Sequence, residues 1–450
     1  MPIRGFLMLA FFLVSIPVCF VRPFYGVLLW YVVAFLNPQS SILYWSGATS
    51  FPWAEAVAIP TLCGFAVFSC GWMARLASRE VGMMVVLWIW FTTTAMVSAH
   101  TPLFMHHTQD TWHRWEFVSK ILLMTIVTIA LVDSFARLRM LVIVMSGCFG
   151  ALVLRSLPFI VMTGGAYRLY GPQFSMVGDN NDFGLALNMT LPLFFFLAQT
   201  ESNRWLKRLF GFLFVATIPA IFCTYSRGAL IGLAATFGLM LLRLKQRAVL
   251  VPIVILAAAM AFLFAPEAWK ERMNPGQGLD SSARERLNAW TFSWNLALDY
   301  PIAGGGFSTF TPELFQRYAP VVGDVRGPHS VYFGVLAEHG FTGLALYLAL
   351  VLSCFAKARR LSRDARFYED QTVVGYINMF RFSLIGFLVS GFFLGRAYFD
   401  YYFAIVACLV VLDRVARDGW ARRSAEDDET LPEADEEFLL PAGGANAKRV

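Results

Sequence analysis

Arginines beside apolar segments are the residues of this sequence best suited to chemistry. Eight of them stand apart from the basic loops that would anchor a membrane protein: Arg168, Arg227, Arg272, Arg284, Arg286, Arg317, Arg326 and Arg396. A guanidinium stays charged at any physiological pH, and its planar fork binds phosphate through two hydrogen bonds. This set therefore indicates an anionic substrate such as a pyrophosphate.

Arg227 lies in Tyr225-Ser-Arg-Gly, between two apolar runs and with no loop long enough to carry it into water. A charge held at a membrane boundary is costly, so it favours a functional role. The alternative is an arginine that snorkels to the interface from a tight turn. Arg168 precedes the cluster Asp179-Asn-Asn-Asp. This cluster can cap the next helix, which does not exclude hydrogen bonds from Asn180 and Asn181 to a sugar.

His329 is the candidate base. It stands in Gly327-Pro-His-Ser, at the start of an apolar run and directly after a long polar connection. The pKa of histidine suits proton transfer near neutral pH, and the alternative is a structural histidine at the interface. Glu338, more than two turns further along, is an acid within an apolar run, which also favours a role.

A second group of histidines suggests a metal. His106, Asp110 and His113 would share one helix face, as zinc ligands can. Trp112 and Trp115 in the same segment are typical interfacial anchors, and we therefore predict no metal and no cofactor. The sequence also has no Gly-x-x-x-x-Gly-Lys loop, nucleotide fingerprint or serine elbow, so ATP-driven chemistry is not indicated.

The composition predicts the elements that position these residues. The 450 residues are 58% hydrophobic and 15% charged, with a mean hydropathy of +0.59, whereas a soluble domain carries roughly 25% charged residues. We predict an all-α polytopic membrane protein with 12 or 13 transmembrane helices. The apolar runs fall at about 5–20, 24–36, 55–73, 81–98, 117–132, 140–162, 183–198, 209–223, 227–242, 248–265, 329–354, 373–395 and 397–413.

Basic loops occupy every second connection between these runs, which predicts that they are cytoplasmic. The other loops, and with them the candidate site, would face the periplasm from a bacterial inner membrane. The connection 266–328 is long enough to be functional, and we expect helices at 265–272 and 282–298 within it. The second of these has an apolar face that would lie on the membrane surface or pack against the spans.

Three regions follow from this pattern. Residues 1–163 form an N-terminal transmembrane region, and residues 164–423 form a transmembrane core that includes the connection 266–328. Residues 424–450 carry eight acids and few aromatic residues, a composition typical of a disordered cytoplasmic tail.

The order of the motifs resembles the O-antigen ligase/polymerase superfamily. The motifs cover about residues 165–350 and are Arg168…Asn180-Asn181, Tyr225-Ser-Arg-Gly, Arg286-x-x-x-Trp290, Asp299-Tyr-Pro-Ile-Ala-Gly-Gly-Gly-Phe, His329-Ser-x-Tyr and Glu338-x-Gly340-x-x-Gly343. The segments Arg22-Pro-Phe-Tyr-Gly and Leu36-Asn-Pro are similar to a subgroup described as O-glycosylation ligases associated with exosortase A.

The resemblance implies metal-independent glycosyl transfer from undecaprenyl pyrophosphate on the periplasmic face of the membrane. Arg168 and Arg227 would hold the pyrophosphate, and His329 would take the proton from the acceptor hydroxyl. Supporting candidates are Arg286, Arg326, Glu338, Arg396, Asn180 and Asn181. Many relatives have Asn-Pro-Asn where this chain has Asp179-Asn-Asn, so the two asparagines are carried over only as supporting residues.

The predicted activity is a ligase that moves a glycan from the lipid carrier to a protein or lipid acceptor. A polymerase that extends the glycan on the same carrier shares these motifs. A transporter of lipid-linked sugar would place paired charges deep in the spans and show internal repeats, and no repeat is detected. A scaffold without catalysis would not need His329, and nothing indicates a nucleic-acid partner.

Overall fold

The computed structural model describes residues 3–38, 51–242, 263, 266–273 and 281–430, and all regular elements within these ranges are helices. The all-α prediction is confirmed. The helices are α1 (Ile3–Val21), α2 (Pro23–Leu36), α4 (Trp53–Phe68), α5 (Trp72–Arg75), α6 (Arg79–His100), η3 (Met105–His107), α7 (Thr108–Leu131), α8 (Phe135–Thr163), α9 (Asn180–Thr200), α10 (Arg204–Cys223), α11 (Arg227–Leu241), α13 (Glu267–Met273), α14 (Ser281–Asp299), α15 (Pro312–Tyr318), α16 (Val331–Phe367), α17 (Gln371–Gly391) and α18 (Asp400–Thr430).

The chain is a polytopic membrane protein. Within the described residues, α6, α8, α9, α10, α16 and α17 are long and apolar enough to cross a membrane, and α1, α2, α4 and α11 are shorter apolar helices. Twelve of the thirteen predicted apolar runs coincide with helices. The remaining run, 248–265, lies almost wholly outside the described residues.

Contacts between distant loops show that the described basic connections share one end of the bundle, whereas the basic connection at 243–247 lies outside the described residues. Arg139 bonds Glu201 through Nε at 2.9 Å, and Arg414 donates to the carbonyls of Arg75 and Val132. At the opposite end Asn37 donates to the carbonyl of Gln173 at 2.9 Å. The end that carries the basic connections is called the basic end, and the opposite end is called the His329 end.

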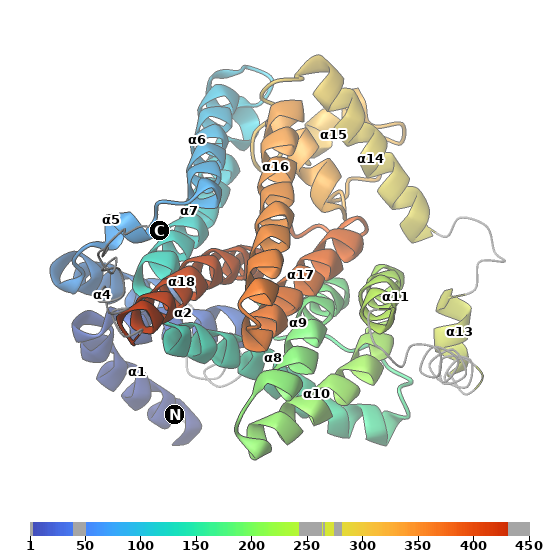
Figure 1. Ribbon diagram of the computed structural model, residues 1–450. Helices are drawn as coiled ribbons and strands as arrows, with labels where there is room; N and C mark the ends of the chain where they lie inside the picture. Colours follow the sequence, from blue (N-terminus) through green and yellow to red (C-terminus); the bar gives the residue numbers. More distant parts are fainter. Residues whose placement is uncertain (1–2, 39–50, 243–262, 264–265, 274–280, 431–450) are drawn as a thin grey trace, which may run out of the picture.

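Beyond the spans at the His329 end, α14 and α15 pack beside α16 as a small helical layer (Figure 1). Its core contains Phe104, Phe292, Leu296 and Phe315, all fully buried. The expected helices in the long connection are confirmed as α13 and α14. The face of α14 that packs carries Phe292 and Leu296. The face predicted from the apolar spacing is mostly exposed, since Leu287, Trp294 and Leu298 lie at the surface.

The glycine run 304–306 joins the small helical layer to α16 at the point where that helix is interrupted. Gly340 has φ 68° and ψ −173°, so the helix is interrupted there. The amides of Gly305 and Gly306 donate to the carbonyls of Ala337 and Glu338, both at 2.9 Å. A Cβ on Gly304 would lie 2.6 Å from the oxygen of Ala337. The motif 299–307 therefore satisfies the carbonyls that the kink leaves open.

The C-terminal helix is longer than predicted. α18 continues to Thr430, seven residues into the segment predicted to be disordered from residue 424. No proline interrupts the helix before Pro432, which allows it to continue into water. Residues 431–450 of the predicted tail lie outside the described residues.

Candidate functional site

His329 stands where three parts of the chain meet: the start of α16, the helix α14 and the segment that contains Gly395. It immediately precedes Ser330, the N-cap of α16, and has a left-handed backbone with φ 42°. Trp290 of α14 donates to the carbonyl of Pro328 at 2.7 Å, which fixes the residue before it. A Cβ on Gly395 would lie 3.4 Å from the Cα of His329. A strained non-glycine residue held on two sides is typical of a functional site.

The electrostatic surroundings keep the imidazole neutral. Its side chain is exposed on one side, yet desolvation by the surrounding protein atoms lowers the pKa of His329 below its ordinary value. The positive charge of Arg286 on α14 lowers the pKa further, and Asp179 opposes this. A neutral imidazole at pH 7 is ready to accept a proton. Arg286 therefore lies close enough to His329 for its charge to act on the imidazole.

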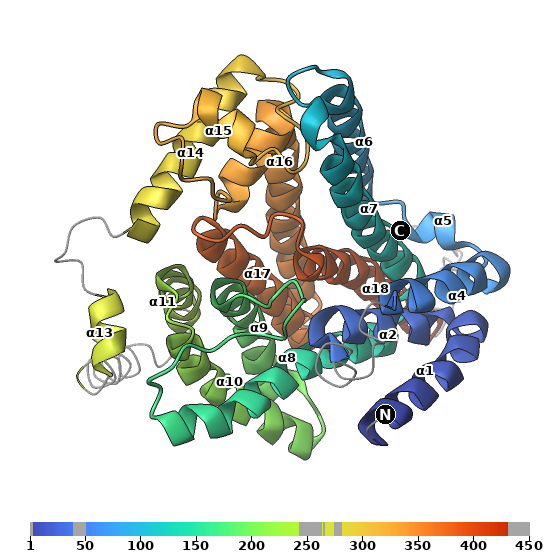
Figure 2. The same cartoon turned by 180° about the vertical axis from the view of Figure 1, so that it is seen from behind.

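The α17–α18 connection, residues 392–399, joins the remaining parts of the site. Arg396 Nη2 lies 2.6 Å from Asp182 Oδ2 in the first turn of α9. A Cβ on Gly228 of α11 would meet Phe393 at 2.8 Å. The ring of Trp290 lies 5.3 Å from that of Phe392. Figures 1 and 2 show this connection between α11 and α14.

Arg227 is the first residue of α11 and is half-buried. The turn before it is tight, because Tyr225 has φ 55° and Ser226 caps the helix by accepting from the amide of Ala229. A helix N-terminus with an arginine in its first turn favours an anion. The turn is also tied to α9, since Asn180 donates to the carbonyl of Thr224 at 2.7 Å.

The asparagine cluster forms the start of α9. Asp179 caps α9 by accepting from the amide of Asn181 at 2.8 Å. The amide of Asn180 is buried and engaged with the backbone. The cluster therefore works as a helix start, and a sugar contact by Asn181 stays a prediction.

Arg168 lies in the segment between α8 and α9 and is exposed. The segment is fixed to the α10–α11 turn, because Leu169 donates its amide to Cys223 and the Tyr225 hydroxyl donates to Gly165. Burial raises the pKa of Tyr225, and the positive charge of Arg168 opposes that rise. Arg168 therefore lies beside the turn that carries Arg227.

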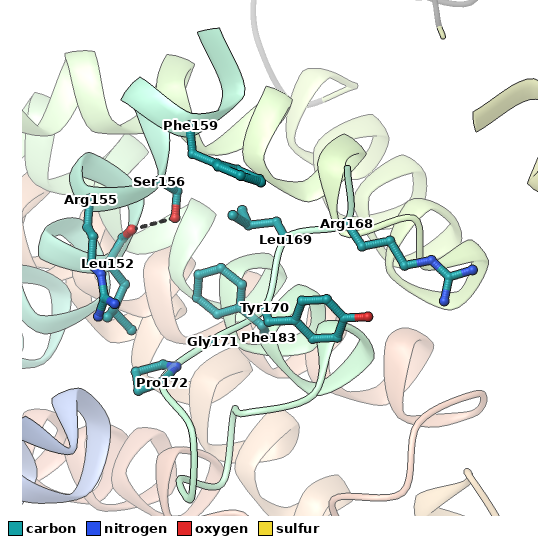
Figure 3. Close-up of a pocket in the computed structure, with 10 residues that line it drawn as sticks. All are labelled: Leu152, Arg155, Ser156, Phe159, Arg168, Leu169, Tyr170, Gly171, Pro172 and Phe183. Atoms are coloured by element: carbon teal, nitrogen blue, oxygen red, sulfur yellow. Dashed lines mark hydrogen bonds between the residues drawn. The ribbon is translucent and has the colours of Figure 1, made fainter. Parts of the chain in front are cut away.

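A cavity of about 340 Å³ adjoins this segment. Figure 3 shows Arg168 and Arg155 at its opposite ends, with Phe159, Leu169 and Phe183 between them, and the side chain of Arg168 directed away from the others. Arg155 was not among the predicted residues, although an arginine within an apolar run is the signal that could have found it.

Two buried polar atoms flank His329 without a protein partner. Within the described residues, Ser330 Oγ and Arg396 Nε form no hydrogen bond. A Cβ on Gly395 would lie 3.7 Å from the amide of Ser330, so the two residues belong to neighbouring backbone segments. Unsatisfied buried groups beside a strained residue indicate a place where a ligand or water completes the hydrogen bonding.

Residues 212–348 match the O-antigen ligase family model. Residues 3–199 match a family of unknown function, DUF5935. No curated protein matches the chain. The ligase-like segment contains Arg227, Arg286 and His329, and the match suggests an enzyme that acts on a lipid-linked glycan.

Two of the supporting candidates do not belong to the site around His329 in the same way. Arg326 lies at its edge, and Glu338 lies apart from it. Arg326 is exposed and pairs with Asp324 at 3.4 Å and Glu285 at 3.8 Å, and its charge contributes to lowering the pKa of His329. Glu338 lies about two turns into α16, where it accepts from the hydroxyl of Tyr398 at 2.5 Å. The structure does not bring Glu338 to His329.

Glu338 instead belongs to a buried network. Its Oε1 accepts from the amide of Ser308 at 2.9 Å. The Tyr398 hydroxyl lies 2.7 Å from His339 Nε2, and His339 Nδ1 lies 2.7 Å from Thr94 Oγ1. All these side chains except Ser308 are nine-tenths or more buried. The network fixes the kink of α16 to α6 and to the α17–α18 connection.

The histidines near α7 have a structural role in the part of the chain described. His106 Nε2 lies 3.0 Å from Thr311 Oγ1 and 3.4 Å from Glu313 Oε2. His107 lies beside Gly305 and is buried. These contacts join η3 to α15, and no group of three or more potential ligands that could hold a metal ion occurs among the described residues.

Proposed function

We propose that the protein transfers a glycan from undecaprenyl pyrophosphate to a hydroxyl of a protein or lipid acceptor, on the periplasmic face of the bacterial inner membrane. The observation that carries this proposal is the convergence of a neutral His329 with Arg286, Arg396 and the Arg227 turn, in a segment similar to O-antigen ligases. A base beside several cations suits the activation of a hydroxyl and the departure of a pyrophosphate.

The reaction is a single displacement at the anomeric carbon. His329 accepts the proton of the acceptor hydroxyl, and the oxygen forms a bond to the anomeric carbon. The bond between that carbon and the pyrophosphate oxygen breaks, and its electron pair leaves with undecaprenyl pyrophosphate. The products are the glycosylated acceptor, the free lipid pyrophosphate and a proton on His329.

The arginines stabilise the charge that develops on the leaving group. Arg227 at the start of α11 and Arg286 on α14 are the proposed pyrophosphate ligands closest to the centre, and Arg168 extends the cationic surface toward α8. Arg396 is partly neutralised by Asp182, so its proposed role is to position the α17–α18 connection. Preorganised cations in a partly dry site contribute to the rate because they need no reorganisation as the bond breaks.

The test is transfer in vitro with a defined undecaprenyl-pyrophosphate glycan, EDTA and cell extract as the source of acceptor. Products from the wild type, His329→Ala and the matched control His100→Ala are compared by mass spectrometry. His100 is exposed at the end of α6. We expect glycan on a protein or lipid acceptor, a loss of at least about a hundredfold in His329→Ala, and no loss in the control.

Two outcomes would change the assignment. Longer glycan that remains on the carrier would identify a polymerase instead of a ligase. Undiminished transfer by His329→Ala, with a melting temperature equal to that of the wild type, would contradict the role of the base.

A further inference from the structure

A second cavity lies at the basic end, far from His329 along the spans. It measures about 590 Å³ and is bounded by the α1–α2 junction, the end of α4 and the connection from α7 to α8. Its charged lining residues are Arg22, Arg75, Arg137 and Asp133. Three guanidiniums and one carboxylate leave an excess of positive charge.

Two of these arginines are held in place by the protein. Arg137 Nη1 lies 2.8 Å from Asp133 Oδ2 and donates to the carbonyl of Leu131, and its guanidinium lies over the ring of Phe24 at 5.2 Å. Arg75 Nη1 lies 3.7 Å from the same carboxylate oxygen. The single carboxylate is therefore shared, and it neutralises only one of the two cations.

Arg22 adds a further charge without compensation. It is exposed and forms no ion pair or side-chain hydrogen bond with the described residues. It is also the N-cap of α2, which has no side-chain cap there. The cavity thus presents cationic groups from three segments, and its positive charge exceeds what the protein itself satisfies.

The neighbouring cavity at the same end provides a contrast. It measures about 380 Å³, shares Arg75, and is also more positive than negative, although two of its cations are paired with acids of its lining. Lys357 lies 2.8 Å from Asp413 and 3.1 Å from Glu80, and Arg417 also pairs with Asp413. The first cavity therefore differs from its neighbour in its large apolar side chains, such as Phe24, Phe68 and Met140, and not in having an excess of positive charge.

The rim of the larger cavity is apolar and open. Val21, Tyr25, Phe68 and Met140 line it and are 55%, 49%, 52% and 40% exposed. On helices of a membrane protein, such side chains face acyl chains. A ligand that satisfies both surfaces is amphiphilic, with an anionic head among the arginines and hydrocarbon beside the rim.

We infer that this cavity binds the phosphodiester headgroup of an anionic phospholipid, with its acyl chains against the apolar rim. Basic pockets between transmembrane helices are a recurrent form of lipid recognition. The site belongs to the segment that matches the family of unknown function, and it is independent of the proposed glycan transfer.

The experiment is native mass spectrometry of the full chain, released from detergent with phosphatidylglycerol or with phosphatidylcholine of identical acyl chains. We expect preferential retention of phosphatidylglycerol, weakened about fivefold by Arg22→Gln. The matched control is Arg204→Gln. Arg204 starts α10, packs over Trp205 and does not line the cavity, so we expect retention equal to that of the wild type.

A second variant keeps the test independent of folding. Arg137→Gln should also weaken retention, and a melting temperature measured in parallel separates this effect from damage to the ion pair with Asp133. Equal retention of the two lipids, or equal weakening by Arg204→Gln, would overturn the inference. Displacement of phosphatidylglycerol by an equal concentration of inorganic phosphate would also overturn it, because the site would then take a free anion.

Discussion

Tyr398→Phe tests whether the buried network at the kink of α16 stabilises the fold and the site above it. Burial and the neighbouring Glu338 carboxylate raise the pKa of Tyr398 well above its ordinary value, so the phenol keeps its proton and donates to Glu338. Its oxygen then accepts from His339 Nε2, and the imidazole is assigned the tautomer with hydrogen on that atom. The substitution removes one hydroxyl that serves two buried partners.

The expected loss follows from these partners. Phenylalanine preserves the ring contacts, but it leaves His339 Nε2 and one oxygen of Glu338 without a hydrogen bond. Each unsatisfied buried group costs about 1–3 kcal/mol, and Glu338 keeps its bond from the Ser308 amide through the other oxygen. We therefore expect the free energy of unfolding to fall by about 2–4 kcal/mol.

Tyr31→Phe is the matched control. The Tyr31 hydroxyl is equally buried but has one neutral partner, Thr128 Oγ1 at 3.2 Å, which also bonds the carbonyl of Met124. Its removal should cost about 1 kcal/mol. Thermal unfolding in one detergent compares the two variants, and a fall in melting temperature for Tyr398→Phe no larger than that for Tyr31→Phe would refute the reasoning.

Three further changes test the site and its support. Arg286→Gln should raise the pKa of His329 toward its ordinary value of 6.5, which moves the acid limb of the transfer rate to higher pH; an unmoved limb in a rate–pH profile would contradict this. Asp182→Asn should slow transfer about tenfold or more, because a charge-assisted bond of 2.6 Å is lost; steady-state kinetics would show this, and an unchanged rate would contradict it. Gly304→Ala should lower the free energy of unfolding by about 1–3 kcal/mol, since φ is +63° and Cβ meets backbone. Gly323→Ala, which has open space around its Cβ, is the control in thermal unfolding, and equal melting temperatures for the two would contradict this expectation.

The sequence predicted the helices and their two ends well because both depend on local composition. Apolar length determines which segments can span the membrane, and the basic loops share one end because they occupy alternate connections. The candidate centre was also predictable in part. His329 and Arg227 both stand at the ends of apolar runs, where a charge or a titratable group is conspicuous in the sequence.

The presence of a charged group in an apolar run could not show that Glu338 lies apart from His329. An acid in an apolar run is conspicuous whether it binds a ligand or a buried hydroxyl, and its partner Tyr398 is sixty residues away along the chain. The segment 299–307 has a similar explanation, because its glycine amides bond the carbonyls of Ala337 and Glu338 only after the long connection folds back onto α16. The motif Glu338-x-Gly340 therefore specifies the kink of α16, at the place where the segment 299–307 packs against that helix. The kink and the network carry the α17–α18 connection, and that connection brings Arg396 and Gly395 to His329.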